Sequence, residues 1–198
     1  MKKLIINTKM NTRIEDVMKY VFANNKAKHS YHNTAHMVQV YNNVIEICQT
    51  LPELSKKEVE LLSIAALFHD FNHSGGKMTD DKNVEIAVKE FKKYAVSKDF
   101  SEDDISFVQR VIEATQYPYV DIKQDIFTDI IRDADMLGSL SACWMQVMFN
   151  LADEFNKSIE EFVPMQIKFH ENMKMNTKFG KEMQKKHQKN ILNTLKCY

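Results

Sequence analysis

Apolar residues recur at helical spacing through most of the chain. Ile14, Val17 and Val21 share one face of a predicted helix, and a second apolar stripe runs through residues 37–48. Residues 61–68 are apolar nearly all round, which is typical of a helix buried at the centre of a fold. The same periodicity predicts further helices over residues 84–95, 101–112, 122–135, 140–151, 167–173 and 179–195.

Few residues interrupt this pattern. Ser55 with Glu58 predicts a capped helix start, and Pro164 predicts a break. Residues 71–80 include two adjacent glycines and predict a loop. Only residues 4–6 suggest a strand, and four glycines with three prolines are too few for a turn-rich β fold. The pattern therefore predicts one all-α domain, a bundle of about seven to nine helices.

The composition is that of an ordinary globular protein. Among 198 residues the formal net charge is zero and charged side chains make up 27%, so no global field draws nucleic acid or an anionic membrane. No apolar run approaches the roughly 18 residues that span a bilayer, and the first ten residues do not resemble a signal peptide. Three widely spaced cysteines, Cys48, Cys143 and Cys197, predict reduced thiols in a cytoplasmic protein.

Four potential metal ligands lie beside predicted helix ends. His36 is near the start of the second helix, His69 and Asp70 end the buried third helix, and Asp135 ends the sixth. Buried polar groups cost free energy unless something binds them, so a buried helix that ends in histidine and aspartate indicates a ligand. Imidazole with carboxylate suits Mn, Fe, Zn, Ni or Co, with Mg at a more carboxylate-rich position. The sequence thus predicts one or two divalent ions, and His73 could serve the second ion or its water.

The order of these residues resembles the HD superfamily of metal-dependent phosphohydrolases. Three segments carry the resemblance, Tyr31-His32-Asn33-Thr34-Ala35-His36, His69-Asp70-Phe71-Asn72-His73 and Ala134-Asp135-Met136. They are similar to the Tyr-His-Asn-x-x-His signature, the His-Asp-x-x-His motif and the fourth-ligand aspartate of class I cyclic-nucleotide phosphodiesterases. The resemblance covers residues 31–137, about half the chain, and implies that residues 1–198 form a single HD-type phosphohydrolase domain.

The resemblance implies a role for each residue of these motifs. The first metal would have four ligands, His36, His69, Asp70 and Asp135. Asp70 would also bridge to a second metal, and a bridging hydroxide would attack phosphorus because bound metal lowers the pKa of water. His32 would protonate the leaving oxygen, and His73 would orient or ligate in the region of the second metal. Tyr31 and Asn33 of the same signature are expected on the substrate side.

The chain departs from the phosphodiesterase pattern in several places. Ser74 stands where those enzymes have proline, and their catalytic domains are considerably longer. Their purine pocket uses a glutamine with a phenylalanine three residues on, and Gln166 and Phe169 have that spacing. An ordinary helix with Phe169 in the core is the alternative. The (p)ppGpp hydrolases of the superfamily carry Glu-Asp shortly after His-Asp, whereas Asn72-His73 stands here and argues against that activity.

Several residues keep two interpretations. Asp133 competes with Asp135 as a ligand, although the resemblance favours Asp135 and leaves Asp133 as an exposed or supporting acid. His32 could only hydrogen-bond a carboxylate, and Asn83 either caps the fourth helix or approaches the site. His170 lies outside the motifs.

The combined prediction is a metal-dependent phosphohydrolase that cleaves a phosphoester bond in a small-molecule nucleotide. The Tyr-His-Asn-x-x-His element favours phosphodiesters, including cyclic nucleotides. The alternatives are a nucleoside 5′-monophosphatase of the same superfamily, and an HD module that has lost catalysis and serves as a nucleotide sensor. Such modules usually show gaps in the ligand set, and this chain shows none. Neutral charge and only three arginines argue against a nucleic-acid-binding protein, and oligomeric state is not indicated.

Overall fold

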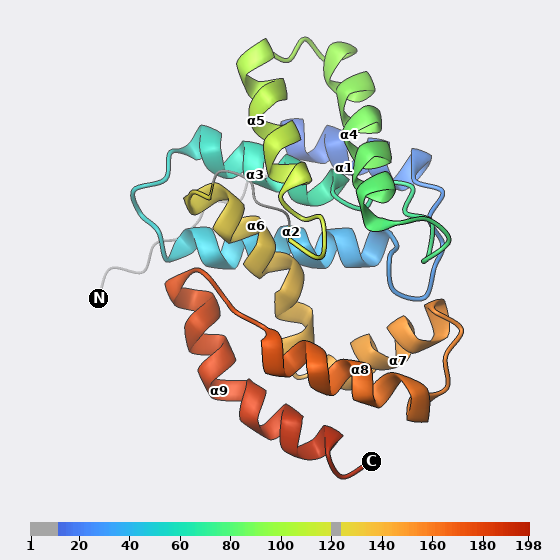
Figure 1. The fold of residues 1–198 in the computed structure, drawn as a ribbon. Coiled ribbons are helices and arrows are strands. Elements are labelled where there is room, and N and C mark those ends of the chain that lie inside the picture. The colour runs from blue at the N-terminus through green and yellow to red at the C-terminus, as the bar shows by residue number, and fades with distance from the viewer. Residues whose placement is uncertain (1–11, 120–123) are drawn as a thin grey trace.

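The computed structural model describes residues 12–119 and 124–198, and helices dominate this part of the chain (Figure 1). The helices are α1 (Thr12–Asn24), α2 (Thr34–Gln49), α3 (Lys56–Phe68), α4 (Asp80–Val96), α5 (Glu102–Glu113), α6 (Ile126–Met136), the short 3-10 helix η1 (Leu137–Leu140), α7 (Trp144–Glu154), α8 (Ile159–Asn172) and α9 (Lys178–Leu195). Within these residues the β pairing is a single isolated bridge between Lys28 and Asn33. The all-α prediction is confirmed, while the strand expected over residues 4–6 and the start of the helix expected from residue 122 lie outside the described residues.

Helix α3 lies at the centre of the fold. Every residue from 61 to 68 is buried, as the all-round apolarity of this stretch predicts. The helix packs against α1, α2 and α5, which together leave it no solvent-exposed face over these two turns. The capping box between Ser55 and Glu58 is present and fixes the start of α3. The end of this helix therefore delivers His69 and Asp70 into the interior.

The helices fall into two groups that α6 connects. Helices α1–α5 form one group, and α7, α8 and α9 lie together at the other end of the molecule (Figure 1). Helix α6 packs against α2 and α5 and continues into η1, which contacts α7 and α9. Among the helices of the described residues, none is both long and apolar enough to cross a membrane.

The break expected at Pro164 is absent. Helix α8 begins at Ile159, where Ser158 and Glu161 form a capping box, and continues through the proline. Pro164 itself is exposed, whereas its neighbours Phe162 and Val163 are buried. The apolar face thus holds the helix together across a residue that lacks a backbone N–H.

The helix expected over residues 140–151 is divided in the structure. Leu140 ends η1, and α7 begins only at Trp144. The hydroxyl of Ser141 donates to the carbonyl of Gly138 and accepts from the backbone N–H of Cys143. These local side-chain hydrogen bonds favour a turn over a continuous helix.

Asp133 is buried and takes no part in a metal cluster, although one interpretation left it exposed. Its carboxylate accepts hydrogen bonds from the backbone N–H groups of Asn176 and Thr177, at 2.8 Å each, and from both of their side chains. A Cβ placed on Gly180 would collide with this carboxylate. Asp133 therefore anchors the start of α9 to α6.

Candidate metal centre

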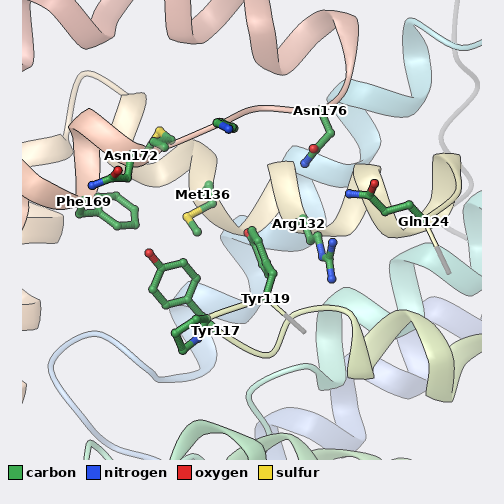
Figure 2. Close-up of a pocket in the computed structure, with 11 residues that line it drawn as sticks. Tyr117, Tyr119, Gln124, Arg132, Met136, Phe169, Asn172 and Asn176 are labelled. Atoms are coloured by element: carbon green, nitrogen blue, oxygen red, sulfur yellow. The ribbon is translucent and has the colours of Figure 1, made fainter. Parts of the chain in front are cut away.

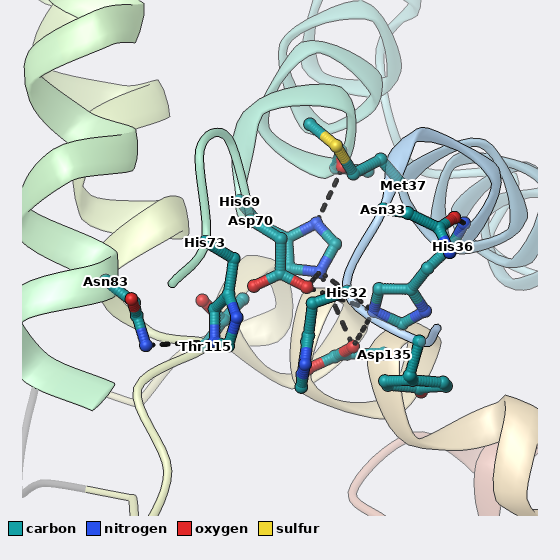
Figure 3. A network of polar contacts seen from close by, with 12 residues as sticks. His32, Asn33, His36, Met37, His69, Asp70, His73, Asn83, Thr115 and Asp135 are labelled. Carbon is teal, nitrogen blue, oxygen red and sulfur yellow. Dashed lines mark hydrogen bonds and ion pairs between the residues drawn. The ribbon is translucent and has the colours of Figure 1, made fainter. Parts of the chain in front are cut away.

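Four donor atoms from three parts of the chain converge in the interior (Figure 3). His36 Nε2 lies 3.3 Å from His69 Nε2. Asp70 Oδ2 lies 3.2 Å from His36 Nε2 and 3.0 Å from His69 Nε2. Asp135 Oδ1 lies 3.1 Å from His36 Nε2 and 3.5 Å from His69 Nε2. The structure thus brings together the four residues that the sequence predicts as metal ligands.

The cap of α2 positions His36. Asn33 precedes this helix in an extended conformation, and its side-chain oxygen accepts from the backbone N–H groups of Ala35 and His36. Its amide donates to the carbonyl of His29 at 2.8 Å. All these contacts of the predicted substrate residue Asn33 are to the backbone of its own segment, so the structure gives it a capping position in the first turn that carries His36.

The tautomer of His69 leaves one nitrogen for a ligand. His69 Nδ1 lies 2.8 Å from the carbonyl oxygen of Ala66, which can only accept a hydrogen bond. Nδ1 therefore carries a proton, and in the neutral ring Nε2 presents a lone pair to the cluster. That lone pair faces His36 Nε2 and two carboxylate oxygens, an arrangement that needs a cation or additional protons.

The two imidazole nitrogens lie at a spacing typical of metal ligands from each other and from an oxygen of each aspartate. Donor atoms held tetrahedrally about 2.1 Å from one ion lie roughly 3.4 Å apart. The five distances that join His36 Nε2 and His69 Nε2 to each other and to the two aspartate oxygens run from 3.0 to 3.5 Å. Two carboxylates with two neutral imidazoles carry two negative charges, which a divalent ion would neutralise. The donor set and its spacing thus suit a transition metal.

The pKa shifts in the cluster also indicate that its two carboxylates attract positive charge. Burial lowers the pKa of His36 and His69, but Asp70 and Asp135 outweigh burial and raise both pKa values above their ordinary range. Burial also raises the pKa of each aspartate, but the histidines outweigh it and hold both pKa values below the ordinary range. Protons therefore gather where a metal ion would sit, and metal binding would release them.

A second polar group consists of His32, His73 and Glu154. His32 and His73 line a cavity, and Glu154 lies beside both of them. Their ligand atoms all fall within 4.8 Å of one another. The rings of His32 and His73 stack with centroids 3.8 Å apart. Glu154 Oε1 lies 2.6 Å from His32 Nδ1, and Glu154 Oε2 accepts from the backbone N–H groups of Tyr31 and His32. Burial raises the pKa of Glu154, but its hydrogen bonds to His32 dominate and lower the pKa to about 2.

Hydrogen bonds fix His73 beside His32. The backbone N–H of Gly75 donates to His73 Nδ1 at 3.1 Å, and the side-chain nitrogen of Asn83 lies 2.9 Å from His73 Nε2. Burial lowers the pKa of His73 to about 4, so its ring is neutral near pH 7. Asn83, for which two interpretations were open, thus approaches the site from within α4, and Thr79 rather than Asn83 precedes that helix.

The cavity beside both groups has a volume of about 900 Å³. The predicted site residues in its wall are Tyr31, His32, His73, Asp135, Gln166 and Phe169. Its remaining lining is largely apolar and comes from α7, α8 and the loop before α4, with further residues from α4, α6 and η1. A volume within roughly 300–1,000 Å³ with few convergent polar groups is typical of small-molecule sites.

The two residues of the proposed purine clamp differ in exposure. Gln166 is buried and Phe169 is half-buried, and both reach the cavity from α8. Tyr31 packs against His36 with ring centroids 4.4 Å apart. Burial, reinforced by Asp135 and Asp70, raises the pKa of Tyr31, which keeps its hydroxyl neutral.

Glu154 is the main residue of this region that the motifs did not identify. It follows Val147 and Leu151 at helical spacing, on the apolar face of α7. Its side chain is only 1% exposed. An acidic residue on an apolar helical face indicates a buried partner. This pattern in the sequence could have identified Glu154 as a site residue.

The fold is shared with three solved bacterial structures. The Lin1889 protein of Listeria innocua has a TM-score of 0.64 at 18% identity and covers 95% of both chains. A Lactobacillus plantarum protein has a TM-score of 0.71 at 14% identity and covers 94% of both chains. Bacillus subtilis YpgQ, solved in complex with ADP, has a TM-score of 0.65 at 16% identity and covers 92% of this chain and 94% of its own.

Sequence comparison adds no closer relationship. No family model matches the chain, and no curated protein matches it significantly. With identities of 14–18%, the structural likeness is one of fold. The chain has an all-helical fold similar to that of these three proteins.

Proposed function

We propose that the protein is a metal-dependent phosphohydrolase that cleaves a phosphoester bond of a nucleotide. The observation that carries this proposal is the convergence of His36, His69, Asp70 and Asp135 next to a cavity that also receives His32. A divalent ion bound by these four side chains would polarise a phosphoryl oxygen and lower the pKa of a water molecule. The HD-like fold supports the same class of reaction, although fold alone does not define chemistry.

His32 is the candidate general acid. Glu154 accepts the hydrogen bond of His32 Nδ1, so the opposite ring nitrogen is the one available to a leaving oxygen. The stacked ring of His73 limits how far His32 can rotate. His32 binds a carboxylate and also lines the cavity, and this position supports the proposed role of general acid.

A nucleotide suits the remaining walls of the cavity. Gln166 offers an amide and Phe169 offers a ring face, the two groups that would contact a purine. Bacillus subtilis YpgQ, a protein of the same fold, was solved in complex with ADP. A phosphodiester is the favoured ester, and a nucleoside monophosphate is the alternative.

The test is hydrolysis by purified protein loaded with Mn²⁺. Substrates are adenosine and guanosine 3′,5′-cyclic monophosphates, the corresponding 5′-monophosphates and bis(4-nitrophenyl) phosphate. Asp70→Asn should reduce kcat/KM more than 100-fold, because even residues that support metal ligands contribute about 10–100-fold. The matched control is Asp103→Asn at an exposed position in the first turn of α5, which should retain activity.

Turnover of monophosphates alone would assign the enzyme as a monophosphatase. Absence of turnover on every ester, with bound metal confirmed by elemental analysis, would contradict the phosphohydrolase proposal. Full activity of Asp70→Asn would contradict the assigned metal centre.

A further inference from the structure

A second cavity, of about 610 Å³, shares part of its wall with the first, and Figure 2 shows the residues that line it. Its walls come from the loop at residues 117–119, from α6 and from residues 169–176. Four residues line both cavities, Tyr117, Met136, Phe169 and Asn172. Met136 directly follows Asp135 of the metal centre. The shared wall therefore connects the second cavity to the cavity that Asp135 lines.

Two aromatic rings mark the boundary between the cavities. Tyr117 and Phe169 meet edge to face, with centroids 6.3 Å apart. Tyr117 is 48% exposed, so its ring is not fixed by the core. Each ring presents surface to both sides, and flat aromatic surfaces of this kind stack on nucleobases.

Tyr119 gives the second cavity a polar group without a partner. Its hydroxyl is buried and has no hydrogen-bond partner in residues 12–119 and 124–198. The guanidinium of Arg132 lies 4.3 Å from the centroid of the Tyr119 ring, and Arg132 Nε donates to the carbonyl of Ala114. The ring is thus held by an anchored cation while its hydroxyl remains available. A buried hydroxyl of this kind gains most from a ligand that hydrogen-bonds to it.

The remaining residues that line the second cavity suit a nucleobase joined to a phosphate. Asn172 and Gln124 offer amides that can pair with the edge of a base, and Lys174 offers a cation. No carboxylate from the described part of the chain lines this second cavity. Aromatic faces, amides and the lysine match the flat, polar and anionic parts of a nucleotide.

We propose that the second cavity holds a second nucleoside, so that the substrate is a phosphodiester that joins two nucleosides across the metal centre. This inference rests on the proposed phosphohydrolase function and narrows its substrate class. Hydrolysis would add the oxygen of water to phosphorus, break the bond from phosphorus to one nucleoside oxygen, and transfer a proton to that oxygen. A mononucleotide would occupy one cavity and leave the other to water.

The kinetic test compares adenylyl-(3′→5′)-adenosine with the methyl phosphodiesters of adenosine at its 3′ and 5′ positions. All three are phosphodiesters, but each methyl ester keeps only one nucleoside. We expect kcat/KM to be at least about tenfold higher for the dinucleoside, because stacking one base contributes roughly 5–150-fold. Tyr119→Ala should lower that ratio by most of this factor, and Tyr119→Phe should lower it by less because the ring remains. Tyr198→Ala, at a tyrosine 70% exposed at the end of the chain, is the matched control and should leave the ratio unchanged.

A binding measurement without metal separates this inference from the proposed function. Saturation-transfer NMR in EDTA should show contact from the protein to both adenines of the dinucleoside, and Tyr119→Ala should lose contact to one of them. Melting temperatures of the variants show whether they are folded. Equal kcat/KM for the three esters, or NMR contact to one adenine only, overturns the second nucleoside site. No turnover of any ester together with NMR contact to both adenines overturns the hydrolase function and supports the site.

Discussion

Three hydrogen bonds to Glu154 determine the orientation of His32. Two come from the backbone N–H groups of Tyr31 and His32, at 2.9 Å each, and the third joins Glu154 Oε1 to His32 Nδ1 at 2.6 Å. A carboxylate that binds both the ring and the backbone of one histidine restricts it to one rotamer. Glu154 is therefore a positioning residue, which would act through His32 rather than on the substrate.

Glu154→Gln should reduce kcat mainly where the leaving group needs a proton. An amide at this position is nearly isosteric but lacks the negative charge that Glu154 places beside His32 Nδ1. We expect about a 100-fold loss of kcat on a nucleoside diester, within the range for general acid catalysis. The loss on bis(4-nitrophenyl) phosphate should be less than about tenfold, because 4-nitrophenolate leaves without full protonation. The readout is kcat for the two esters side by side.

Glu171→Gln provides the control for this substitution. Glu171 is an exposed glutamate on α8 that pairs with Lys196, away from the cavity. Its substitution should change neither kcat. Equal losses on both esters in Glu154→Gln would point to damaged structure and contradict the positioning role.

Most of the residues that the motifs identify at this site fall in short segments of the chain. His32 and His36 fall in one short segment, as do His69 and Asp70, and helix-end geometry fixes how each pair is presented. Glu154 reaches His32 across 122 positions of sequence. Its pairing depends on how α7 lies against the segment before α2, which apolar periodicity does not specify.

At the scale of elements, the packing of α8 outweighs the tendency of a proline to end a helix. A proline inside a helix usually ends it, yet α8 buries Phe162, Val163, Gln166 and His170 on one face that continues through Pro164. Element type was predictable from this periodicity, while the start of α8 depended on the capping pair Ser158 and Glu161. Local capping and long-range packing thus decide the boundaries that apolar spacing leaves open.

His170 makes the packing of α8 dependent on pH. Its ring is buried, and its Nδ1 has no hydrogen-bond partner among the residues that the structure describes. Burial lowers the pKa of His170 to about 4, against roughly 6.5 in an unfolded chain. Between these values the unfolded state binds the extra proton, so stability falls as pH decreases from about 6.5 to 4.

His170→Gln should remove this part of the pH dependence. The wild-type protein should lose up to about 3 kcal/mol more free energy of unfolding than the variant between pH 7 and pH 4. Urea denaturation of both proteins at these two pH values gives the comparison. EDTA in all samples excludes metal binding, which also depends on pH, and His73 contributes equally to both proteins. Parallel pH profiles would contradict a neutral, buried His170.

At the scale of the whole molecule, the metal centre joins helices that are far apart in sequence. Helices α2 and α6 and the end of α3 each contribute ligands, and α2 packs against both α3 and α6. The order and type of these helices could be predicted from the chain because each carries its own apolar stripe. The placement of α7–α9 could not, because their contacts with η1 and with one another are set by tertiary packing.

Metal binding should therefore stabilise the entire fold. A ligand that binds only the native state at 100 times its Kd adds about 2.7 kcal/mol. For a chain of this size each kcal/mol raises Tm by about 2–4 °C, so Mn²⁺ should raise Tm by roughly 5–11 °C over the EDTA-treated protein. Differential scanning calorimetry with and without Mn²⁺ measures this shift. In His69→Ala the shift should fall to less than about 2 °C, because one of four ligands is lost. Glu154→Gln should keep the full shift, since Glu154 belongs to the separate group with His32 and His73. An undiminished shift in His69→Ala, with loss of the shift in Glu154→Gln, would instead place the stabilising ion between His32, His73 and Glu154.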